Sequence, residues 1–387
     1  MSGLDSDAIV VGGGLAGMAA AIAVAKAGLR TVHLAPTAPP DRRTSALMMP
    51  SVDYLRSAGL IDAPAALGHP LTQIRIIDAT GRLIRAPETL FDATEAGLEA
   101  FGWNFANSAL LEQFHAVAAT LGNLDTRTLG ANAMVRAGGG WAVTLSDGTT
   151  VHAPLVVGAD GKQSLVRRSA GLRVSEHKFN QSALVCDLEL GRPIGGTSIE
   201  FHYPKGPFTL VPAGGNRANL VWIDDAGVLA AAQAGGHDHL AQLFVEKSQR
   251  LFGGISLATP AFIFPLGMLS VASAGLDGVV LTGESAHAFP PIGAQGLNLG
   301  LRDVADLAAS LADIDRSQPG WGNAVSTFYA LRRAADLART GTMVDTLFRS
   351  LLADMIPAQA LRAGGLWALK LAPGLRRQAF DLGMGQR

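Results

Sequence analysis

The sequence contains very little cysteine, no excess of either charge and few aromatic residues. Cys186 is the only cysteine among 387 residues, so an intrachain disulfide is excluded, and the Cys/His spacing of a structural zinc site is missing. This cysteine usage fits a reducing compartment. The formal net charge of -1 creates no field that would attract nucleic acid. We therefore expect no metal, no disulfide and no nucleic-acid partner.

One charge-free run, residues 8–25, reaches the lower length limit of a membrane span. It contains four glycines and follows Asp5 and Asp7, where a secretory signal would carry positive charge. We predict neither a signal nor an anchor, and a cytoplasmic protein. The mean hydropathy of +0.26 leaves peripheral contact with the inner face of the membrane open. A basic C-terminal segment is compatible with such contact or with an ordinary solvated helix face; it contains Arg362, Lys370, Arg376, Arg377 and Arg387 against Asp381.

The N-terminal segment has the order strand, glycine-rich turn, helix, strand. Residues 7–11 are apolar and β-branched, as in a buried parallel strand. Gly12-Gly13-Gly14-Leu15-Ala16-Gly17 follows directly, residues 15–27 have an Ala-rich helical pattern, and residues 30–34 form a second strand pattern. This context favours a dinucleotide-binding βαβ unit over a glycine-rich turn without a ligand.

Three glycines of this turn have separate expected roles. Gly12 permits the sharp turn, Gly14 lets backbone N–H groups approach a pyrophosphate, and Gly17 lets the helix pack closely on the strand. The acidic residue that usually follows the second strand and binds the adenosine ribose is missing, because the strand continues into Leu34-Ala35-Pro36. We expect the ribose to be held differently.

Two later motifs also connect a buried strand to a turn. Residues 155–161, LVVGADG, lead into a helical pattern from Ser164. Residues 278–287, GVVLTGESAH, are followed by PPIGAQGLN at residues 290–298 and by a helical pattern through Asp303. Taken alone, the first of these motifs is only a strand and a turn, whereas the second is highly specific.

In this order, the three motifs resemble the signatures of the flavoprotein aromatic hydroxylases, GxGxxG, GADGxxSxVR and GDAAHxxPPxxGxGxN. Residues 43–47, 201–222 and 290–303 are most similar to the hydroxylases of ubiquinone biosynthesis. The likeness continues to the C-terminus through a predicted helix with Tyr329, Arg332, Arg333 and Asp336.

The resemblance implies an α/β fold of the para-hydroxybenzoate hydroxylase type. It has a Rossmann-like FAD-binding domain of the GR2 type, an inserted β-sheet substrate domain and a C-terminal helical segment. We expect the FAD domain to be discontinuous, at residues 1–70, 100–180 and 265–330, the substrate sheet at 71–99 and 181–264, and the helical segment at 331–387.

The resemblance also assigns residues to FAD. Arg43 is placed near the phosphate and ribose, and Asp160 with Gly161 at the turn shared by FAD and the reductant. Glu284 stands where the family usually has an aspartate that reaches the ribityl hydroxyls. The complete set of expected cofactor contacts is Gly12, Gly14, Leu15, Ala16, Gly17, Arg43, Asp160, Gly161, Gly283, Glu284, Pro291, Gly293, Gln295, Gly296, Leu297 and Asn298.

The expected chemistry belongs largely to the cofactor. The resemblance implies that NAD(P)H reduces FAD, that dioxygen forms a flavin C4a-hydroperoxide, and that oxygen passes to a phenolic ring. Pro291 and Gly293 would form the surroundings of C4a, and residues 293–298 would direct backbone N–H groups to the flavin pyrimidine edge. We name no catalytic base, and we expect His287 to be a structural, hydrogen-bonded residue.

The expected substrate is a polyprenylated phenol or quinol of ubiquinone biosynthesis, within an assembly of that pathway. Hydroxylation of a small soluble phenol, saturation of prenyl double bonds by a flavin reductase, and an FAD-stabilised scaffold without activity remain alternatives. Five segments with strand character suggest the substrate sheet: 72–79, 183–190, 198–203, 207–211 and 218–223. Aromatic residues on them form either a pocket wall or ordinary core, and they are Phe201, Tyr203, Phe208 and Trp222.

Overall fold

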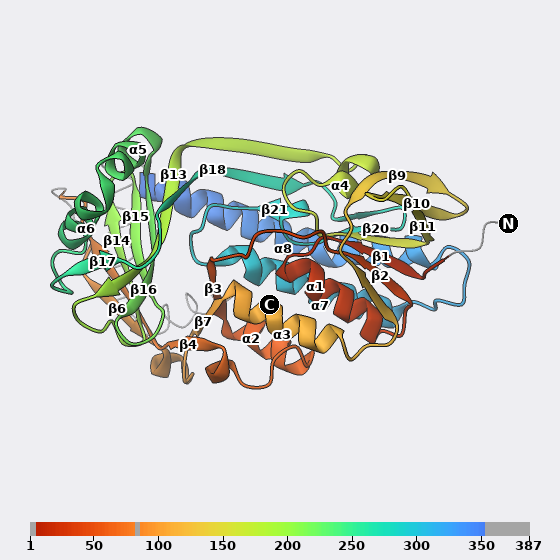
Figure 1. Cartoon of the computed structure of the whole chain (residues 1–387), viewed down its shortest axis with the longest axis horizontal. Coiled ribbons are helices and arrows are strands. Elements are labelled where there is room, and N and C mark those ends of the chain that lie inside the picture. Colours follow the sequence, from red (N-terminus) through yellow and green to blue (C-terminus); the bar gives the residue numbers. More distant parts are fainter. Residues whose placement is uncertain (1–4, 82–85, 353–387) are drawn as a thin grey trace.

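The computed structural model describes residues 5–81 and 86–352, and they form two parts that lie side by side along the longest axis of the molecule (Figure 1). One part is built around a parallel sheet with helices beside it. The other part is built around a larger, mainly antiparallel sheet. This is the mixed α/β architecture that the motifs predict.

The parallel sheet has the strand order β19-β20-β12-β1-β2-β8. Its strands are parallel except for β19, which runs antiparallel to β20. The four strands β20, β12, β1 and β2 are fully buried, as expected for apolar strands covered on both faces. The bounds are β1 Ala8–Val11, β2 Thr31–Leu34, β8 Leu124–Arg127, β12 Leu155–Gly158, β19 Gly275–Leu276 and β20 Val279–Leu281.

Helices pack beside this sheet and share one hydrophobic core with it. Helix α1 packs against α3 and α7, and α7 packs against the long helix α8 (Figure 1). The helix bounds are α1 Leu15–Lys26, α2 Met49–Ser57, α3 Asn107–Ala118, α4 Leu165–Ser169, α7 Gln295–Asp313 and α8 Trp321–Leu352, with 3-10 turns η1 Pro64–Ala66, η2 Ala93–Ala96 and η3 Gly283–Ser285.

The larger sheet has nine strands, in the order β21-β18-β13-β16-β15-β14-β5-β6, with β17 paired to β13. Helices α5 Ala226–Ala234 and α6 Gly236–Lys247 cover one face of it and form a second core. The strand bounds are β5 Gln73–Asp78, β6 Thr89–Asp92, β13 Val174–Leu190, β14 Thr197–Tyr203, β15 Gly206–Pro212, β16 Arg217–Asp225, β17 Ile255–Leu257, β18 Phe262–Val271 and β21 His287–Ala288.

Two three-stranded sheets complete the part that contains the parallel sheet. One has the order β11-β10-β9 and the other β3-β7-β4. The second of them places β3, which follows Arg43 directly, next to the start of α7. The bounds are β3 Thr44–Met48, β4 Gly68–Leu71, β7 Gly102–Ala106, β9 Ala131–Ala137, β10 Gly140–Leu145 and β11 Thr150–Ala153.

Two of the expected domain boundaries fall inside long, continuous strands. Strand β13 crosses the boundary at 180, and β18 crosses the boundary at 264. Both strands run between the two parts of the molecule and pair with each other over most of their length (Figure 1). The division into an FAD domain and a substrate domain stays a proposal. The basic segment that begins at Met355 lies outside the described residues.

Candidate functional site

The sequence motifs meet at one edge of the parallel sheet. Strands β1, β12 and β20 are parallel neighbours, so their carboxyl ends lie at the same edge. Gly12 follows β1, Asp160 follows shortly after β12, and Glu284 follows shortly after β20. Ligands of open α/β sheets bind at this edge, in the crevice beyond the carboxyl ends of the strands.

The glycine-rich turn at this edge is shaped partly by protein contacts and partly by open space. A Cβ atom at Gly12 would overlap the carbonyl oxygen of Ala159, and a Cβ atom at Gly17 would overlap the carbonyl oxygen of Gly12. A Cβ atom at Gly14, the residue that precedes helix α1, would meet no atom within 4 Å. Gly12 and Gly17 are therefore required by packing, whereas Gly14 faces free space beside the helix N-terminus.

A buried histidine forms a hydrogen bond with the backbone of the glycine-rich turn. His33 of β2 is fully buried, and its Nε2 lies 2.9 Å from the carbonyl oxygen of Gly12. Burial lowers the pKa of His33, although the hydrogen bond to Gly12 opposes this shift, so the ring is neutral at pH 7. Because the carbonyl oxygen can only accept, Nε2 carries the hydrogen. The sequence did not lead us to expect this contact, although a histidine inside an otherwise apolar strand could have indicated a buried hydrogen bond.

The N-terminal turn and the motif late in the chain are in direct contact. A Cβ atom at Gly283 would lie 3.1 Å from the Cβ atom of Ala16 in α1. A Cβ atom at Gly300 in α7 would lie 3.5 Å from the Cα atom of Gly283 and 3.7 Å from the Cβ atom of Ala16. Residues far apart in the sequence therefore meet where α1, η3 and α7 begin.

The start of α7 is an irregular turn that points into free space. Gly293 and Ala294 both have left-handed backbone conformations, with φ of 62° and 55°. Gln295 is buried and donates from Nε2 to the carbonyl oxygen of Gly293. A Cβ atom at Gly296 would meet no atom within 4 Å. The first N–H groups of a 19-residue helix thus begin beside an open face.

The Asn298 side chain connects this turn to β3 by hydrogen bonds. Its Oδ1 accepts a hydrogen bond from Met48 N at 2.9 Å, and its Nδ2 donates to the carbonyl oxygens of Ala46 and Ala294. Asn298 is therefore occupied in positioning the backbone. Leu15 at the start of α1 is buried in the core, and Leu297 packs against the same core, so their side chains also have structural contacts.

Charged side chains gather near the same edge. Arg43 pairs with Asp41 at 2.8 Å, and Asn107 Nδ2 donates to Asp41 at 2.9 Å. Burial alone would raise the pKa of Asp41, but the hydrogen bonds from Arg43 and Asn107 lower it to about 2. The hydrogen bond to Asp41 raises the pKa of Arg43, and the charge of Glu284 adds to that effect. Glu284 in turn lies 3.9 Å from Lys162. Arg43 and Lys162 thus interact with Glu284 from two different segments.

The carboxylate of Asp160 holds its own turn. Ser164 Oγ donates to one oxygen at 2.5 Å, and Val166 N donates to the other at 3.1 Å. Arg167 is buried and donates to the carbonyl oxygens of Lys162 at 2.6 Å and Ser285 at 2.7 Å. Arg167 therefore joins the turn after β12 to the turn after β20. Gly161 has a φ of 78°, and a Cβ atom there would meet no atom within 4 Å.

A buried ionic network lies behind the turn at Gly283. Asp303 of α7 accepts hydrogen bonds from Gly283 N at 2.8 Å and from His287 Nε2 at 2.6 Å. Arg333 of α8 lies 2.8 Å from the other oxygen of Asp303. Arg333 is fully buried and also pairs with Asp306 and Asp336. These contacts agree with a structural role for His287.

The aromatic residues of the nine-stranded sheet belong to its core. Phe201, Phe208 and Trp222 are essentially fully buried on the face covered by α5 and α6. The opposite face contains Val221 and Ile223, which share one hydrophobic cluster with Ile292, the neighbour of Pro291. The face that carries Val221 and Ile223 therefore lies toward the turn that contains Pro291 and Ile292, and we call it the inner face. Of the two interpretations of the aromatic residues, core packing is the one that the structure supports.

The residues at this edge fit a bound dinucleotide. Exposed backbone at Gly14 and Gly296 leaves room where side chains would otherwise stand, at the N-termini of two helices. Among residues 5–81 and 86–352, no cluster of side chains could hold a metal ion. The expected contacts from Gly12 to Asn298 are brought together at one edge, although their individual roles remain proposals.

Comparisons with known proteins give the same family. A model described as FAD binding domain matches residues 5–321. The ubiquinone hydroxylase UbiL of Rhodospirillum rubrum is 32% identical over 394 residues, covering 98% of this chain and 90% of its own length. The 3-demethoxyubiquinol 3-hydroxylase of Escherichia coli is 28% identical and covered completely, as is this chain. The crystal structure of p-nitrophenol 4-monooxygenase PnpA from Pseudomonas putida superposes over all of both chains with a TM-score of 0.80 at 18% identity, which shows a shared fold. The chain therefore belongs to the FAD-binding family of flavin-dependent monooxygenases, with FAD as its cofactor, and NAD(P)H is the reductant that is typical of this family.

Proposed function

We propose that this protein hydroxylates the aromatic ring of a polyprenylated phenol or quinol in ubiquinone biosynthesis, with dioxygen as the second substrate. The observation that carries the proposal is end-to-end similarity to two relatives whose names specify ubiquinone or demethoxyubiquinol hydroxylation. Similarity over the whole chain includes the inner face and α8 as well as the FAD-binding motifs.

In this proposal, FAD lies across the carboxyl edge of the parallel sheet. The N-terminus of α1 beside Gly14 binds the pyrophosphate, and Arg43 and Glu284 contact the adjoining phosphate and ribityl groups. Pro291 and Gly293 border the reactive part of the isoalloxazine. FAD, when bound, supplies the activation of dioxygen that no amino-acid side chain can provide. Asp160 and Gly161 act through their backbone, because the Asp160 carboxylate already has two partners.

The protein contributes electrostatics and a fixed geometry. A reduced flavin carries negative charge near N1 and O2, and the N-terminus of α7 offers N–H groups that stabilise such charge. The contacts of Asn298 and the network around Asp303 hold this turn in place from two sides. The isoalloxazine would therefore meet donors that need no rearrangement when the charge develops.

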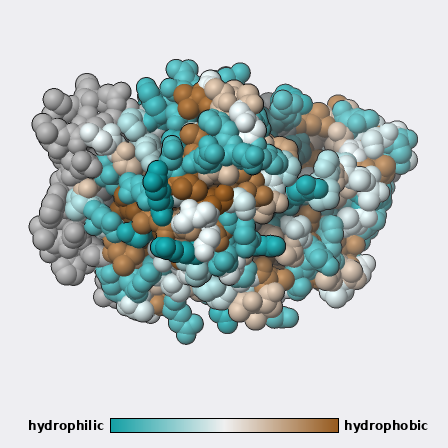
Figure 2. All heavy atoms as spheres, turned by 60° about the vertical axis from the view of Figure 1, so that its left-hand side comes forward, coloured by the Kyte–Doolittle hydropathy of each residue, from teal (hydrophilic) through white to brown (hydrophobic). Residues whose placement is uncertain are grey.

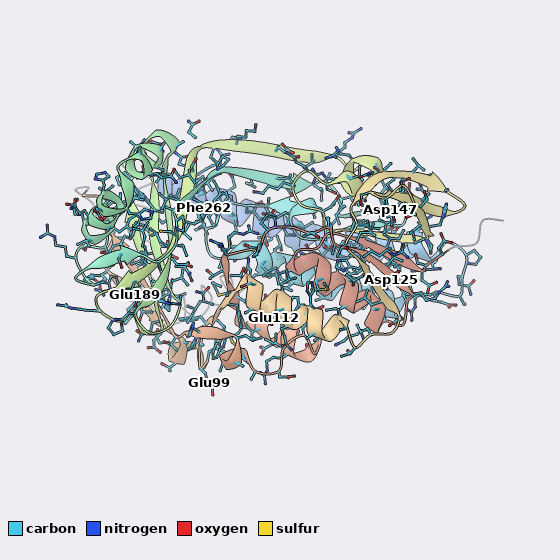
Figure 3. The ribbon with its side chains drawn as sticks, in the orientation of Figure 1. Glu99, Glu112, Asp125, Asp147, Glu189 and Phe262 are labelled. Atoms are coloured by element: carbon cyan, nitrogen blue, oxygen red, sulfur yellow. The ribbon has the colours of Figure 1, made fainter. Side chains whose placement is uncertain are left out.

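The inner face suits an apolar, ring-containing substrate. Ala183 and Ile223 lie in one cross-strand row of the nine-stranded sheet, and Phe264 extends this row to the sheet edge. Phe262 and Phe264 are each about half exposed. In Figure 3, Phe262 of β18 is labelled on the side of this sheet that is nearer the rest of the chain. Exposed aromatic side chains at this edge would allow a prenyl tail to leave the site.

We further propose that the protein reaches its substrate by peripheral contact with a membrane surface, within an assembly of the pathway. Within residues 5–81 and 86–352, no helix has the length and apolar character needed to cross a bilayer. Hydrophobic atoms gather in the middle of one face among hydrophilic ones (Figure 2). Leu331 and Phe328 on α8 are additional exposed apolar side chains. Such side chains support interfacial binding without insertion.

Two experiments test this function. In a strain that lacks the gene, mass spectrometry of the quinone fraction should reveal a precursor that lacks one ring hydroxyl, and the intact gene should restore the mature quinone. A deletion strain with an unchanged quinone profile would contradict the substrate assignment. With purified protein, incorporation of oxygen from labelled dioxygen separates hydroxylation from prenyl reduction.

Hydroxylation of a small soluble phenol is the second candidate, because PnpA, whose name specifies p-nitrophenol, shares the fold. A binding assay distinguishes the two candidates. The proposed function predicts that affinity rises with each added prenyl unit, since each buries further apolar surface. Affinity that is independent of tail length would favour the soluble phenol.

A further inference from the structure

Strand β14 presents two ionisable side chains on the inner face of the nine-stranded sheet. Successive residues of a strand point to opposite faces. Ile199 and Phe201 belong to the core beneath α5 and α6, so Glu200 and His202 lie on the inner face. The next strand continues the arrangement, because Glu200 pairs with Thr209 and Thr209 pairs with Val221.

This cross-strand row leads toward the turn that contains Pro291 and Ile292. Val221 packs in the same cluster as Ile292, which directly follows Pro291. Glu200 therefore lies on the same face as Val221, two strands further along the sheet. An aromatic ring held between this face and the turn at Pro291 would have its edge toward Thr209 and Glu200.

Glu200 and His202 contact each other and remain accessible. His202 Nε2 lies 3.2 Å from Glu200 Oε2, and the two side chains are 12% and 29% exposed. In the part of the chain that the structure describes, no other side-chain hydrogen bond of either residue is found, so Glu200 Oε1 can accept one from a ligand. Asp78 of β5 pairs with His202 on this face, but its carboxylate accepts hydrogen bonds from Thr80 and Ala86.

We propose that Glu200, held by His202, binds a ring hydroxyl of the substrate and accepts its proton during hydroxylation. The inference rests on the proposed function, because it requires a phenolic or quinolic ring. The substrate O–H donates to Glu200 Oε1, while His202 Nε2–H donates to Oε2 and fixes the carboxylate. When the proton transfers, the substrate O–H bond breaks, a carboxyl O–H bond forms, and the electron pair stays on the substrate oxygen.

The relative acidities determine when this transfer occurs. A phenol is a much weaker acid than a carboxylic acid, so the proton stays on the bound phenol before reaction. The hydroxyl becomes much more acidic as the ring gives electrons to the incoming oxygen, and transfer to the carboxylate is then favourable. Glu200 is thus a hydrogen-bond acceptor in the resting complex and a proton acceptor during the reaction. It selects rings that carry a free hydroxyl.

The test compares 2-geranylphenol with its methyl ether, which differ only in the donor that Glu200 would bind. FAD fluorescence of the holoprotein reports the affinity for each. A hydrogen bond to a charged group predicts that the phenol binds about 10- to 100-fold more tightly than the ether. In Glu200→Gln this preference should fall by about tenfold, and hydroxylation of the phenol should slow. Glu246→Gln makes the same change on the exposed surface of α6 and should leave the preference unchanged.

His202 is a positioning residue, and its variants separate positioning from folding. His202→Gln keeps an N–H donor near Glu200 and should keep most of the preference for the phenol. His202→Leu removes the donor and should reduce the preference in the direction of Glu200→Gln. Retained FAD absorbance shows that each variant is folded.

The possible failures are distinguishable. An unchanged preference in Glu200→Gln, with the phenol still hydroxylated by the wild type, would overturn the role of Glu200 alone. If the wild-type holoprotein bound neither compound, the proposed substrate class would be wrong, and the role of Glu200 would be overturned with it. Equal affinity of the wild type for phenol and ether would also overturn the role of Glu200.

Discussion

Replacing Gly14 by valine should abolish FAD retention without unfolding the protein. A Cβ atom at Gly14 would meet no protein atom within 4 Å, and the residue has φ of -78° and ψ of 176°, a conformation that valine readily adopts. The added side chain therefore occupies only the space beside the N-terminus of α1, where the pyrophosphate is proposed to bind. Replacing a glycine at a compatible position changes folding stability by about 1 kcal/mol or less.

The neighbouring glycine provides the contrast. A Cβ atom at Gly17 would overlap the carbonyl oxygen of Gly12, so Gly17→Ala forces helix α1 away from the turn. Strain of this kind in a packed interior costs about 1–3 kcal/mol. We expect Gly14→Val to lose FAD at nearly wild-type apoprotein stability, and Gly17→Ala to lose apoprotein stability as well. The stabilities must be compared without FAD, because a bound ligand raises the apparent stability.

The assay combines two measurements on the purified proteins. Visible absorbance gives the FAD content per chain, and urea unfolding of the apoproteins gives the free energy of unfolding. Gly14→Val that purifies yellow with one FAD per chain would refute the placement of the pyrophosphate. Gly14→Val apoprotein that is destabilised as strongly as Gly17→Ala would show that Gly14 is needed for packing rather than for binding.

Three further variants test other parts of the molecule. Arg333→Met leaves Asp303, Asp306 and Asp336 without their fully buried cation, so the free energy of unfolding should fall by about 3–5 kcal/mol in urea titrations. Wild-type stability of this variant would contradict the importance of the network. Phe208→Ala removes a buried ring beneath α6 and should lower the free energy of unfolding by about 3–5 kcal/mol. The folded holoprotein of this variant should keep its affinity for 2-geranylphenol. A large loss of affinity at full stability would instead support the pocket-wall interpretation. Asp41, with its pKa lowered to about 2, stabilises the folded state above the unfolded-state pKa of about 3.9. The stability difference between wild type and Asp41→Asn should therefore be constant above about pH 5 and shrink toward pH 2. A constant difference down to about pH 2 would refute the Asp41–Arg43 pair.

Local sequence patterns predicted the strands and the helix that form the carboxyl edge of the parallel sheet. Apolar β-branched runs ending in glycine or aspartate correctly indicated β1, β12 and β20, because buried parallel strands tolerate few other residues. The predicted helix at 15–27 matches α1, which ends at Lys26. The contact of Ala16 with Gly283 follows once these strands are placed in one sheet, since their carboxyl ends share an edge.

Cross-strand register and side-chain partners could not be predicted in the same way. Period-two alternation shows that Phe201 and Glu200 face opposite sides, but it does not say which side α5 and α6 cover. The support of Gly12 by His33 depends on the pairing of β1 with β2. Asp160 is a comparable case, because its two hydrogen bonds to Ser164 and Val166 exist only after α4 has formed.

The residue that holds the adenosine ribose stays open in the proposed site. Ala35 follows β2 where an acidic residue is usual, and a Cβ atom at Gly13 would lie only 3.1 Å from the Cβ atom of Ala35. The backbone is therefore closely packed at this point. In the proposed site, the helix N-termini and the charged group of Arg43, Lys162 and Glu284 would supply the remaining contacts to FAD.

The proposed reaction requires that FAD, bound between the glycine-rich turn and the start of α7, deliver oxygen to a prenylated phenolic ring. Mass spectrometry can follow this transfer in the product formed from 2-geranylphenol by purified holoprotein, NAD(P)H and isotopically labelled dioxygen. We predict a hydroxylated ring that carries one labelled oxygen atom, and no such product from Gly14→Val. Consumption of NAD(P)H with a reduced prenyl chain, or a product whose new oxygen comes from water, would contradict this mechanism.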